Sequence, residues 1–474
     1  MTFFCKGISP WVIRNPKRQI RYMSTRFKCV DWLSGASIYE VNIRQYTPEG
    51  TIKAFEQHLP RLRKMGVDIL WFMPLTPISV QGRKGSLGSY YSCSNYMEIN
   101  PEFGTAADFK ELVQQAHQQG FKVIIDWVAN HTGWDHIWTK HPDWYLRDAE
   151  GNFTETHGWE DVIDLNYQNT DMQSAMIHAM KYWIGMFDID GFRCDMAHLV
   201  PLSFWQKARV ACEKLKQLFF LGECDQDSYS SVFDATYAWR WMHASEKLLH
   251  QQSLPANITE FQATLQHYNS LPVGAEKLYF TSNHDENSWN GTEFEKYGNL
   301  APVLAAFSFL YPAVPLIYSG QEIPNTKRLK FFDKDQLDWP QAPQQPQLAT
   351  FYKTLTDLHK QPAFGLSARL QWLSTKVADD QTPSTVLAYY LQADNEEEKN
   401  EAGGKALVLL NFSLDNSQLF DLAGGLQQDQ LAGTFAHLDQ RMISEAATVL
   451  HINQTWVLPP ASFSVYVLES PRNL

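Results

Sequence analysis

The segment FDIDGFRCD, residues 187–195, decides how this chain of 474 residues is organised. We interpret it as a short buried strand that stops at Gly191 and then presents Arg193 and Asp195 on one side. Residues two apart in an extended chain point to the same face. A guanidinium beside a carboxylate favours the ionised form that an oxygen nucleophile requires. Because isolated Arg–Asp pairs at strand ends are also common structural ion pairs, the rest of the chain must decide.

Seven further short apolar segments are typical of strands, and most have helical patterns between them. They occupy residues 37–43, 67–73, 121–125, 218–222, 231–236, 278–282 and 315–319. Eight strands alternating with helices predict an α/β fold, a (β/α)8 TIM barrel over residues 31–365. Within it, Pro60 is predicted to kink or break a helix, and Thr105 to cap the next one.

Two regions depart from this alternation. Residues 132–170 are irregular and polar, and predict a short inserted subdomain after the third strand. We interpret its four tryptophans as flat surfaces for stacking on sugars, with core filling as the alternative; they are Trp134, Trp138, Trp144 and Trp159. Residues 370–474 alternate in a strand pattern and predict a C-terminal all-β sandwich domain.

The composition disfavours some classes of binding partner and favours one cellular compartment. The net charge of −12 disfavours nucleic acid or an anionic membrane as the main partner. No run of eighteen apolar residues occurs, so no membrane span is predicted. The six cysteines have neither disulfide-like nor metal-ligand spacing, which favours free thiols in a cytoplasmic protein.

The first 30 residues form a predicted N-terminal tail. They contain several Lys and Arg and no acidic residue, which is faintly similar to a transit peptide. No continuous apolar segment marks a secretory signal, and Met23 is an alternative start of the chain.

Polar side chains follow several of the predicted strands. Chemistry in such barrels takes place at the carboxyl ends of the strands. The residues there are Asp126 with Asn130 and His131, Arg193 with Asp195, Glu223, and His284 with Asp285. Glycosidic bond cleavage needs one ionised and one protonated carboxyl group. Asp195 beside Arg193 suits the ionised role, and Glu223, after the apolar residues 219–221, suits an acid whose pKa is raised by burial.

These segments resemble the four signature motifs of the α-amylase superfamily of glycoside hydrolases (family 13 type), in the order of that family. The motifs are DWVANH at 126–131, GFRCD at 191–195, GE at 222–223 and NHD at 283–285. Supporting matches are YSCSNY at 91–96, NPEFGT at 100–105, DLN at 164–166, PLIYSGQE at 315–322 and LPPASF at 458–463. The resemblance covers nearly the whole chain after residue 36.

The resemblance implies a retaining glycosidase that cleaves mainly α-1,4 bonds of starch, glycogen or maltodextrins through a covalent glycosyl-enzyme. It implies Asp195 as nucleophile, Glu223 as general acid/base, and Asp285 as the carboxylate that holds and distorts the sugar. The implied substrate-binding residues are Tyr91, Asp126, His131, Arg193, His198 and His284. Of these, Arg193 would orient Asp195, Tyr91 would stack beneath the sugar, and Asp126 would anchor the network.

One departure from the family pattern and one uncertain metal site affect what can be carried over. Many members have a Lys-His pair shortly after the nucleophile, where this chain has His198 and Leu199, so a preference inferred from that pair does not transfer. The resemblance implies no cofactor for the chemistry but allows a structural calcium ion, for which Asn130 matches one ligand. A lone Asn is also common as a hydrogen-bonding loop residue.

Other interpretations remain open at this point. A transglycosylase or an α-glucosidase would use the same fold, because sugar can intercept the covalent intermediate in place of water. A metal-assisted hydrolase would use Asp126, His131, His284 and Asp285 as ligands. A catalytically silent carbohydrate-binding protein is the third class, and the presence of all three carboxylates argues against it.

Overall fold

The computed structural model describes most of the chain. The described residues are 27–272, 274–323, 325–339, 346–377, 383–423, 426–427, 430–439, 444–451 and 454–469. Almost all of the predicted tail, including Cys5 and Met23, therefore lies outside them.

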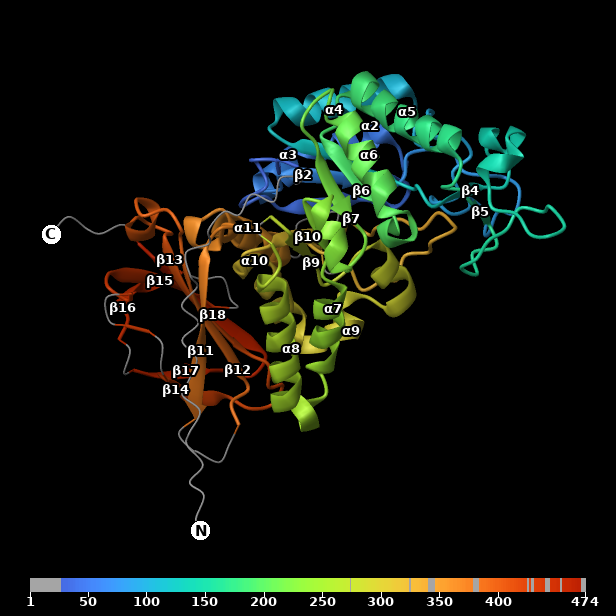
Figure 1. The fold of residues 1–474 in the computed structure, drawn as a ribbon. Coiled ribbons are helices and arrows are strands. Elements are labelled where there is room, and N and C mark those ends of the chain that lie inside the picture. The colour runs from blue at the N-terminus through green and yellow to red at the C-terminus, as the bar shows by residue number, and fades with distance from the viewer. Residues whose placement is uncertain are drawn as a thin grey trace, which may run out of the picture.

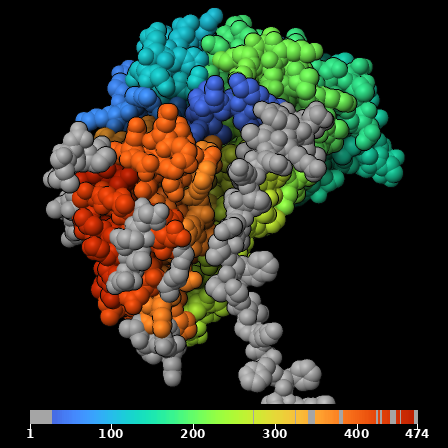
Figure 2. Space-filling view, turned by 60° about the vertical axis from the view of Figure 1, so that its left-hand side comes forward, coloured from blue at the N-terminus to red at the C-terminus, as the bar shows by residue number. Residues whose placement is uncertain are grey.

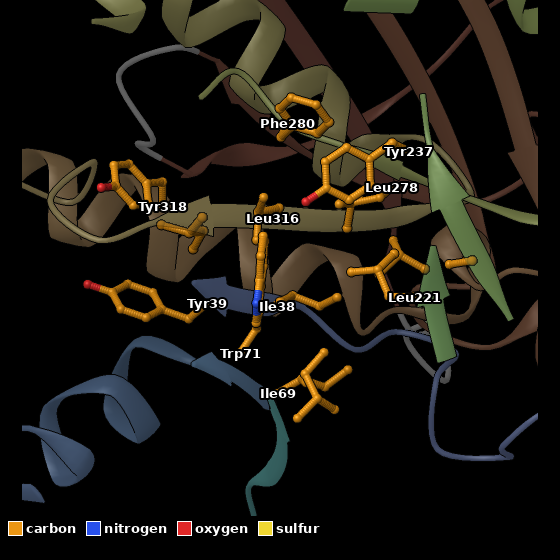
Figure 3. Packing of buried hydrophobic residues seen from close by; sticks show 14 of the residues in the cluster. Ile38, Tyr39, Ile69, Trp71, Leu221, Tyr237, Leu278, Phe280, Leu316 and Tyr318 are labelled. Atoms are coloured by element: carbon orange, nitrogen blue, oxygen red, sulfur yellow. The ribbon is translucent and has the colours of Figure 1, made fainter. Parts of the chain in front are cut away.

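Eight parallel strands close into a barrel in the order β1-β10-β9-β8-β7-β6-β3-β2. Their bounds are β1 (Ile38–Val41), β2 (Ile69–Phe72), β3 (Lys122–Trp127), β6 (Gly191–Cys194), β7 (Phe219–Gly222), β8 (Ala235–Tyr237), β9 (Glu276–Tyr279) and β10 (Val314–Tyr318). Side chains fill the interior, and Figure 3 shows Ile38, Trp71, Leu278 and Leu316 packed together from four strands. The predicted TIM barrel is confirmed.

Eleven α-helices are described. They are α1 (Ile43–Tyr46), α2 (Ile52–Glu56), α3 (Leu59–Met65), α4 (Ala106–Gln118), α5 (Thr170–Phe187), α6 (Leu202–Cys212), α7 (Trp239–Lys247), α8 (Leu254–Asn269), α9 (Glu293–Tyr297), α10 (Ala301–Leu310) and α11 (Pro346–His359). The predicted break near Pro60 separates α2 from α3, and Pro60 lies in the first turn of α3, where its missing N–H costs nothing. Thr105 caps α4, as predicted, and the structure adds a capping box with Asp108. No helix in the described ranges has the length and apolarity to cross a bilayer.

The segment 187–195 differs from its predicted form. Its first residue, Phe187, ends α5, and Asp188 turns the chain out of the helix with a φ of 57°. The strand β6 starts at Gly191 instead of stopping there. A Cβ at Gly191 would lie 2.0 Å from the carbonyl oxygen of Phe219 on β7. The glycine therefore permits the close approach of β6 and β7, and Arg193 lies within the strand.

The inserted subdomain is built on a two-stranded antiparallel sheet, β4 (His131–Gly133) with β5 (Val162–Asp164). Its tryptophans divide into two groups, of which the first, Trp134, Trp138 and Trp144, packs against the buried hydrophobic core. The ring of Trp138 lies 5.2 Å from that of Trp144 and 4.9 Å from that of Tyr96, measured between centroids, so this pair fills a local core. Trp159 instead lines the cavity described below. Core filling, the alternative to sugar stacking, therefore describes Trp138 and Trp144, whose rings meet edge to face and pack against the core.

The C-terminal region is all-β, as predicted. Its strands are β11 (Arg369–Val377), β12 (Val386–Gln392), β13 (Lys405–Asn411), β14 (Gln418–Ala423), β15 (Thr434–Asp439), β16 (Ser444–Val449), β17 (Thr455–Leu458) and β18 (Ser462–Leu468). They form one antiparallel sheet in which β11 pairs first with β12 and then with β14. The two halves enclose a core that includes Leu407, Leu409, Phe420 and Trp456.

The opposite face of this sheet packs on the barrel helices. The Phe412 ring lies 5.8 Å from that of Phe261 on α8, and the Tyr389 hydroxyl donates to the Leu310 carbonyl at 3.0 Å. Figure 2 shows this domain, orange to red, against the side of the barrel, and Figure 1 shows the inserted subdomain on the far side from it. The domain boundaries at 31–365 and 370–474 stay predictions.

Candidate active site

A cavity of about 410 Å³ opens at the carboxyl ends of the barrel strands. Its lining includes the three predicted catalytic carboxylates and two predicted sugar-binding side chains: Asp195, Glu223, Asp285, Tyr91 and His131. A second cavity of about 480 Å³ lies beside α11 and the C-terminal domain, lined mainly by apolar groups, and contains none of these residues. The first cavity is therefore the candidate site.

The guanidinium of Arg193 is the centre of the site. Its Nη1 donates to Asp195 Oδ1 at 2.8 Å and to Asp126 Oδ1 at 3.0 Å. Its Nη2 lies 2.9 Å from Glu223 Oε2, an ion pair without hydrogen-bond geometry. These groups come from the ends of β3, β6 and β7, so barrel closure assembles them around one cation. Arg193 and Asp126 lie beneath the cavity and do not line it.

Burial opposes ionisation of the carboxyl groups around Arg193. It raises the pKa of Asp195 and the pKa of Glu223, and in both cases the Arg193 guanidinium and the nearby His284 oppose the rise. Burial also raises the pKa of Asp126, to about 7. A raised pKa is what a general acid requires.

The backbone turn after Asp195 positions the carboxylate of Glu223. Met196 follows Asp195 with a φ of 39°, in the left-handed region that is unusual for a side chain of this kind. This turn aims the Met196 N–H at Glu223 Oε2, to which it donates at 2.8 Å. The contact ties the loop after β6 to the acid at the end of β7.

A chain of hydrogen bonds links His284 to the same cluster. His284 Nδ1 donates to Glu40 Oε1 at 2.6 Å, and Nε2 lies 2.6 Å from the Tyr91 hydroxyl, which donates to Asp126 Oδ2 at 3.1 Å. Burial lowers the pKa of His284, but the charges of Asp285 and Glu40 outweigh it and raise this pKa to about 9. His284 is therefore an imidazolium at neutral pH, with both ring nitrogens protonated.

His131 has the opposite protonation state. Burial lowers its pKa to about 4, so the ring is neutral at pH 7. The Asn130 side-chain amide nitrogen lies 3.3 Å from His131 Nδ1, which assigns the ring proton to Nε2. His131 lines the cavity and can donate this proton to a sugar hydroxyl.

Two predicted residues lie at the edge of the site or outside it. Asp285 keeps 37% of its side chain exposed in the cavity, where a ligand can reach it. His198 lies on the short helix Ala197–Leu199 and does not line the cavity. Its buried Nδ1 is among the side-chain atoms without a hydrogen-bond partner. The substrate-binding role of His198 stays a prediction.

Sequence reasoning missed four parts of the site. Glu40 ends β1 as the other carboxylates end their strands, so the same rule could have found it. Of the other three, Lys84 and Phe331 come from loops, and Trp289 comes from the helical turn Glu286–Asn290. Trp289 is 54% exposed, and its ring lies 5.4 Å from that of Phe331. Phe331 in turn stacks on Tyr91 at 6.1 Å. No local pattern distinguishes these aromatics from core residues.

The surroundings of Asn130 offer few further ligands for the predicted calcium ion. The Asn130 side-chain amide faces His131, and Asp164 has one buried carboxylate oxygen without a partner. Calcium takes about 6–8 oxygen ligands. Within the described ranges, no group of three or more His, Cys, Asp or Glu side chains is placed to hold a metal. Calcium at Asn130 stays a prediction, and no step below depends on it.

Comparisons with known proteins identify the family and the fold. The family described as "Alpha amylase, catalytic domain" matches residues 24–144 and 139–363. Alpha-amylase MalA of Haloarcula japonica is 27% identical over 424 residues, which cover 85% of this chain and 59% of that relative. A cyclomaltodextrinase of Geobacillus thermopakistaniensis is 24% identical, with 89% of this chain and 71% of that relative covered.

Solved structures show the same architecture. A noncanonic maltogenic alpha-amylase from Thermotoga neapolitana superposes with a TM-score of 0.77 at 28% identity, covering 92% of this chain and 99% of that one. An alpha-amylase from Lactobacillus plantarum superposes with a TM-score of 0.75 at 26% identity, covering 91% and 99%. These similarities span both the barrel and the C-terminal domain.

Proposed function

Since this chain belongs to the alpha-amylase family, we propose that it is a glycosidase that hydrolyses α-glucosidic bonds, mainly α-1,4, of starch, glycogen or maltodextrins with retention. The observation that carries this proposal is the single buried guanidinium of Arg193, which contacts both Asp195 and Glu223 in one cavity. Retaining glycosidases need this pairing of a nucleophile with a neighbouring acid.

In the first step, Asp195 attacks the anomeric carbon while Glu223 protonates the departing glycosidic oxygen. The hydrogen bond from Arg193 holds Asp195 in position, and burial supports a protonated Glu223. In the second step, Glu223 takes a proton from water, which attacks the glycosyl-enzyme and releases Asp195. Glu223 supplies the proton of the first step and regains a proton from water in the second.

The other cavity residues would hold the sugar. Asp285 is open to the cavity and would accept hydrogen bonds from sugar hydroxyls. The neutral His131 would donate through Nε2, and the Tyr91 ring, stacked on His284 with an interplanar angle of 16°, would present a flat face. Such contacts accelerate the reaction only where they strengthen in the transition state.

Glu223→Gln tests the acid/base assignment. Loss of the proton donor should lower kcat on maltoheptaose by about 100- to 10,000-fold, while titration calorimetry still detects maltoheptaose binding. Exogenous azide should restore part of the rate on an activated aryl glucoside. The leaving group of this substrate departs without needing a proton. Undiminished turnover on maltoheptaose would refute the role of Glu223.

Product analysis separates hydrolysis from transglycosylation. A time course on maltoheptaose should contain only products shorter than the substrate. Longer products would show that sugar, in place of water, intercepts the glycosyl-enzyme.

Exhaustive chelation of metal ions should leave kcat unchanged. A loss of kcat that zinc reverses would favour the metal-assisted alternative.

A further inference from the structure

Two loop segments meet at one side of the cavity. Residues 82–89 follow β2 and residues 331–333 follow β10; together we name them the end wall. Lys84, Ser89, Phe331 and Phe332 of the end wall line the cavity.

Hydrogen bonds join the two segments of the end wall. The Ser86 N–H and hydroxyl donate to Asp333 Oδ1 at 2.8 and 2.6 Å, and the Leu87 N–H donates to the Phe332 carbonyl at 3.0 Å. A Cβ at Gly85, whose φ is 64°, would lie 2.5 Å from Phe332 Cβ. The segments therefore lie in direct contact, with no passage between them at this point.

The end wall also contacts the inserted subdomain. Lys84 Nζ lies 3.5 Å from Asp161 Oδ1, and Lys84 and Asp161 both line the cavity. Gly82 packs so closely on the Trp134 ring that a Cβ there would lie 2.9 Å from it. The end wall thus continues from the loop after β10 across to the inserted subdomain.

Buried side chains after β1 support the end wall from below. Arg44 donates to the Gly88 carbonyl at 3.0 Å and is held by Glu102 at 2.8 Å. Gln45 donates through Nε2 to the carbonyls of Lys330 and Asp333 at 2.8 and 2.9 Å. Because both Arg44 and Gln45 are fully buried, these supports fix the position of the end wall.

The barrel order tells which end of a substrate meets the end wall. Glu223 follows β7, which lies opposite β1 in the closed ring, whereas β2 and β10 are the two neighbours of β1. The leaving group departs where Glu223 protonates it, so the reducing-end part of the substrate extends toward β7. The non-reducing end then points toward β1 and meets the end wall.

We infer that this protein takes α-glucans by their non-reducing ends and releases short products, because the end wall stops the chain from running through the site. This inference rests on the proposed function and specifies its substrate mode. The cavity volume of about 410 Å³ suits a short terminal segment, since pockets for small ligands span about 300–1,000 Å³. Trp289 and Phe331 offer ring faces to that segment.

A blocked substrate tests the inference directly. 4-Nitrophenyl α-maltoheptaoside is compared with the same compound carrying a 4,6-O-ethylidene group on its non-reducing glucose, and cleavage is followed by chromatography. The free compound should be cleaved at least about 100-fold faster, because the block denies its terminal sugar the binding energy of the closed subsite. Equal rates would overturn the inference while leaving the proposed function intact. Cleavage of neither compound would overturn the proposed function, and the inference with it.

A variant with a weakened end wall provides the second test of the inference. The triple variant Lys84→Ala, Ser86→Ala, Asp333→Ala removes the side-chain contacts of the end wall between its two segments and with the inserted subdomain, while the supports from Arg44 and Gln45 remain. It should raise the blocked-to-free rate ratio about tenfold or more. The control, Lys247→Ala, removes an exposed ion pair with Glu260 at 2.6 Å on the outer helices and should leave the ratio unchanged. An unchanged ratio in a triple variant that unfolds at the wild-type temperature would overturn the role of the end wall. If the triple variant fails to fold, the wild-type comparison still decides the inference.

Discussion

At the scale of single residues, two cations are shared among five acids. Arg193 contacts Asp126, Asp195 and Glu223, and the imidazolium of His284 lies between Glu40 and Asp285. Burial makes every one of these charges depend on its neighbours, because a charge without a partner is costly away from water. The site therefore responds as a unit to pH and to substitution.

Glu40→Gln should alter the pH dependence of stability. The folded-state pKa of His284, about 9, lies above the ordinary value of 6.5. Protonated His284 therefore stabilises the wild type fully below pH 6.5, and this contribution, on the order of 3 kcal/mol, is lost as pH rises toward 9. In Glu40→Gln the loss should occur at lower pH, because one of the two anions that raise the pKa is gone.

Thermal unfolding measured from pH 6 to pH 10 checks this expectation. Glu260→Gln, which alters an exposed carboxylate on α8, is the control and should follow the wild-type curve. Superimposable curves for wild type and Glu40→Gln would contradict the assignment of His284 as the titrating group.

Trp289→Ala should weaken substrate binding and leave the fold intact. Trp289 is 54% exposed and meets Phe331 and Phe332 at the rim of the cavity. Loss of one stacking ring, worth about 0.5–1.5 kcal/mol, should raise KM for maltoheptaose by about 2- to 10-fold with little change in kcat. Steady-state kinetics measure this, and Trp289→Phe should recover most of the affinity. An unchanged KM would exclude Trp289 from the substrate path.

At the scale of elements, the contact between β6 and β7 controls the alignment of the catalytic groups. The two strands pair from Gly191↔Phe219 to Cys194↔Gly222, which places the loops with Asp195 and Glu223 side by side. This register depends on a residue without a side chain at the start of β6. The glycine in the segment FDIDGFRCD is thus required by strand packing, while Arg193 and Asp195 are required by the proposed chemistry.

Gly191→Ala should be severely destabilising. The new Cβ would lie 2.0 Å from the Phe219 carbonyl oxygen, and backbone atoms on both strands would have to move. We expect a loss of at least about 3 kcal/mol in the free energy of unfolding. Gly185→Ala on α5 is the matched control, because no atom lies within 4 Å of the added carbon.

The control should instead gain about 0.5–1 kcal/mol from helix propensity. Urea denaturation measures both changes, and soluble yield gives a second measure for Gly191→Ala. Similar stabilities for the two variants would show that β6 and β7 can move apart without cost.

At the scale of the whole molecule, the barrel and the C-terminal domain share one hydrophobic core. Residues of β12, β13 and β18 belong to the same cluster of buried side chains as the barrel. We therefore expect one cooperative unfolding transition in calorimetry, because exposing this face would leave apolar surface uncovered on both partners.

Phe412→Ala tests this coupling. Removing the ring that faces Phe261 should cost about 3–5 kcal/mol and lower the temperature of the whole transition. Leu409→Ala, on the other face of the same strand, leaves the contact with the barrel intact and serves as the comparison. A transition that splits in Phe412→Ala but not in Leu409→Ala would show that the two domains can unfold separately.

The sequence by itself determined the strands, their carboxyl ends and the residue types placed there. Apolar runs followed by Asp126, Asp195, Glu223 and Asp285 are local patterns, and local patterns suffice to predict a barrel with acids at one end. The break before α3 and the capping box of α4 were predictable for the same reason. The resemblance to a family then proposed the roles of these acids.

Only the tertiary structure decided how those residues meet. The contact of Arg193 with three carboxylates, the pairing of Glu40 with His284 and the end wall all join segments far apart in the chain. The tertiary structure also packs Trp138 and Trp144 together in a local core, whereas Trp159 lines the cavity. Ring closure sets these contacts, because the closed order of strands and the burial it produces are properties of the whole barrel. No single segment contains them.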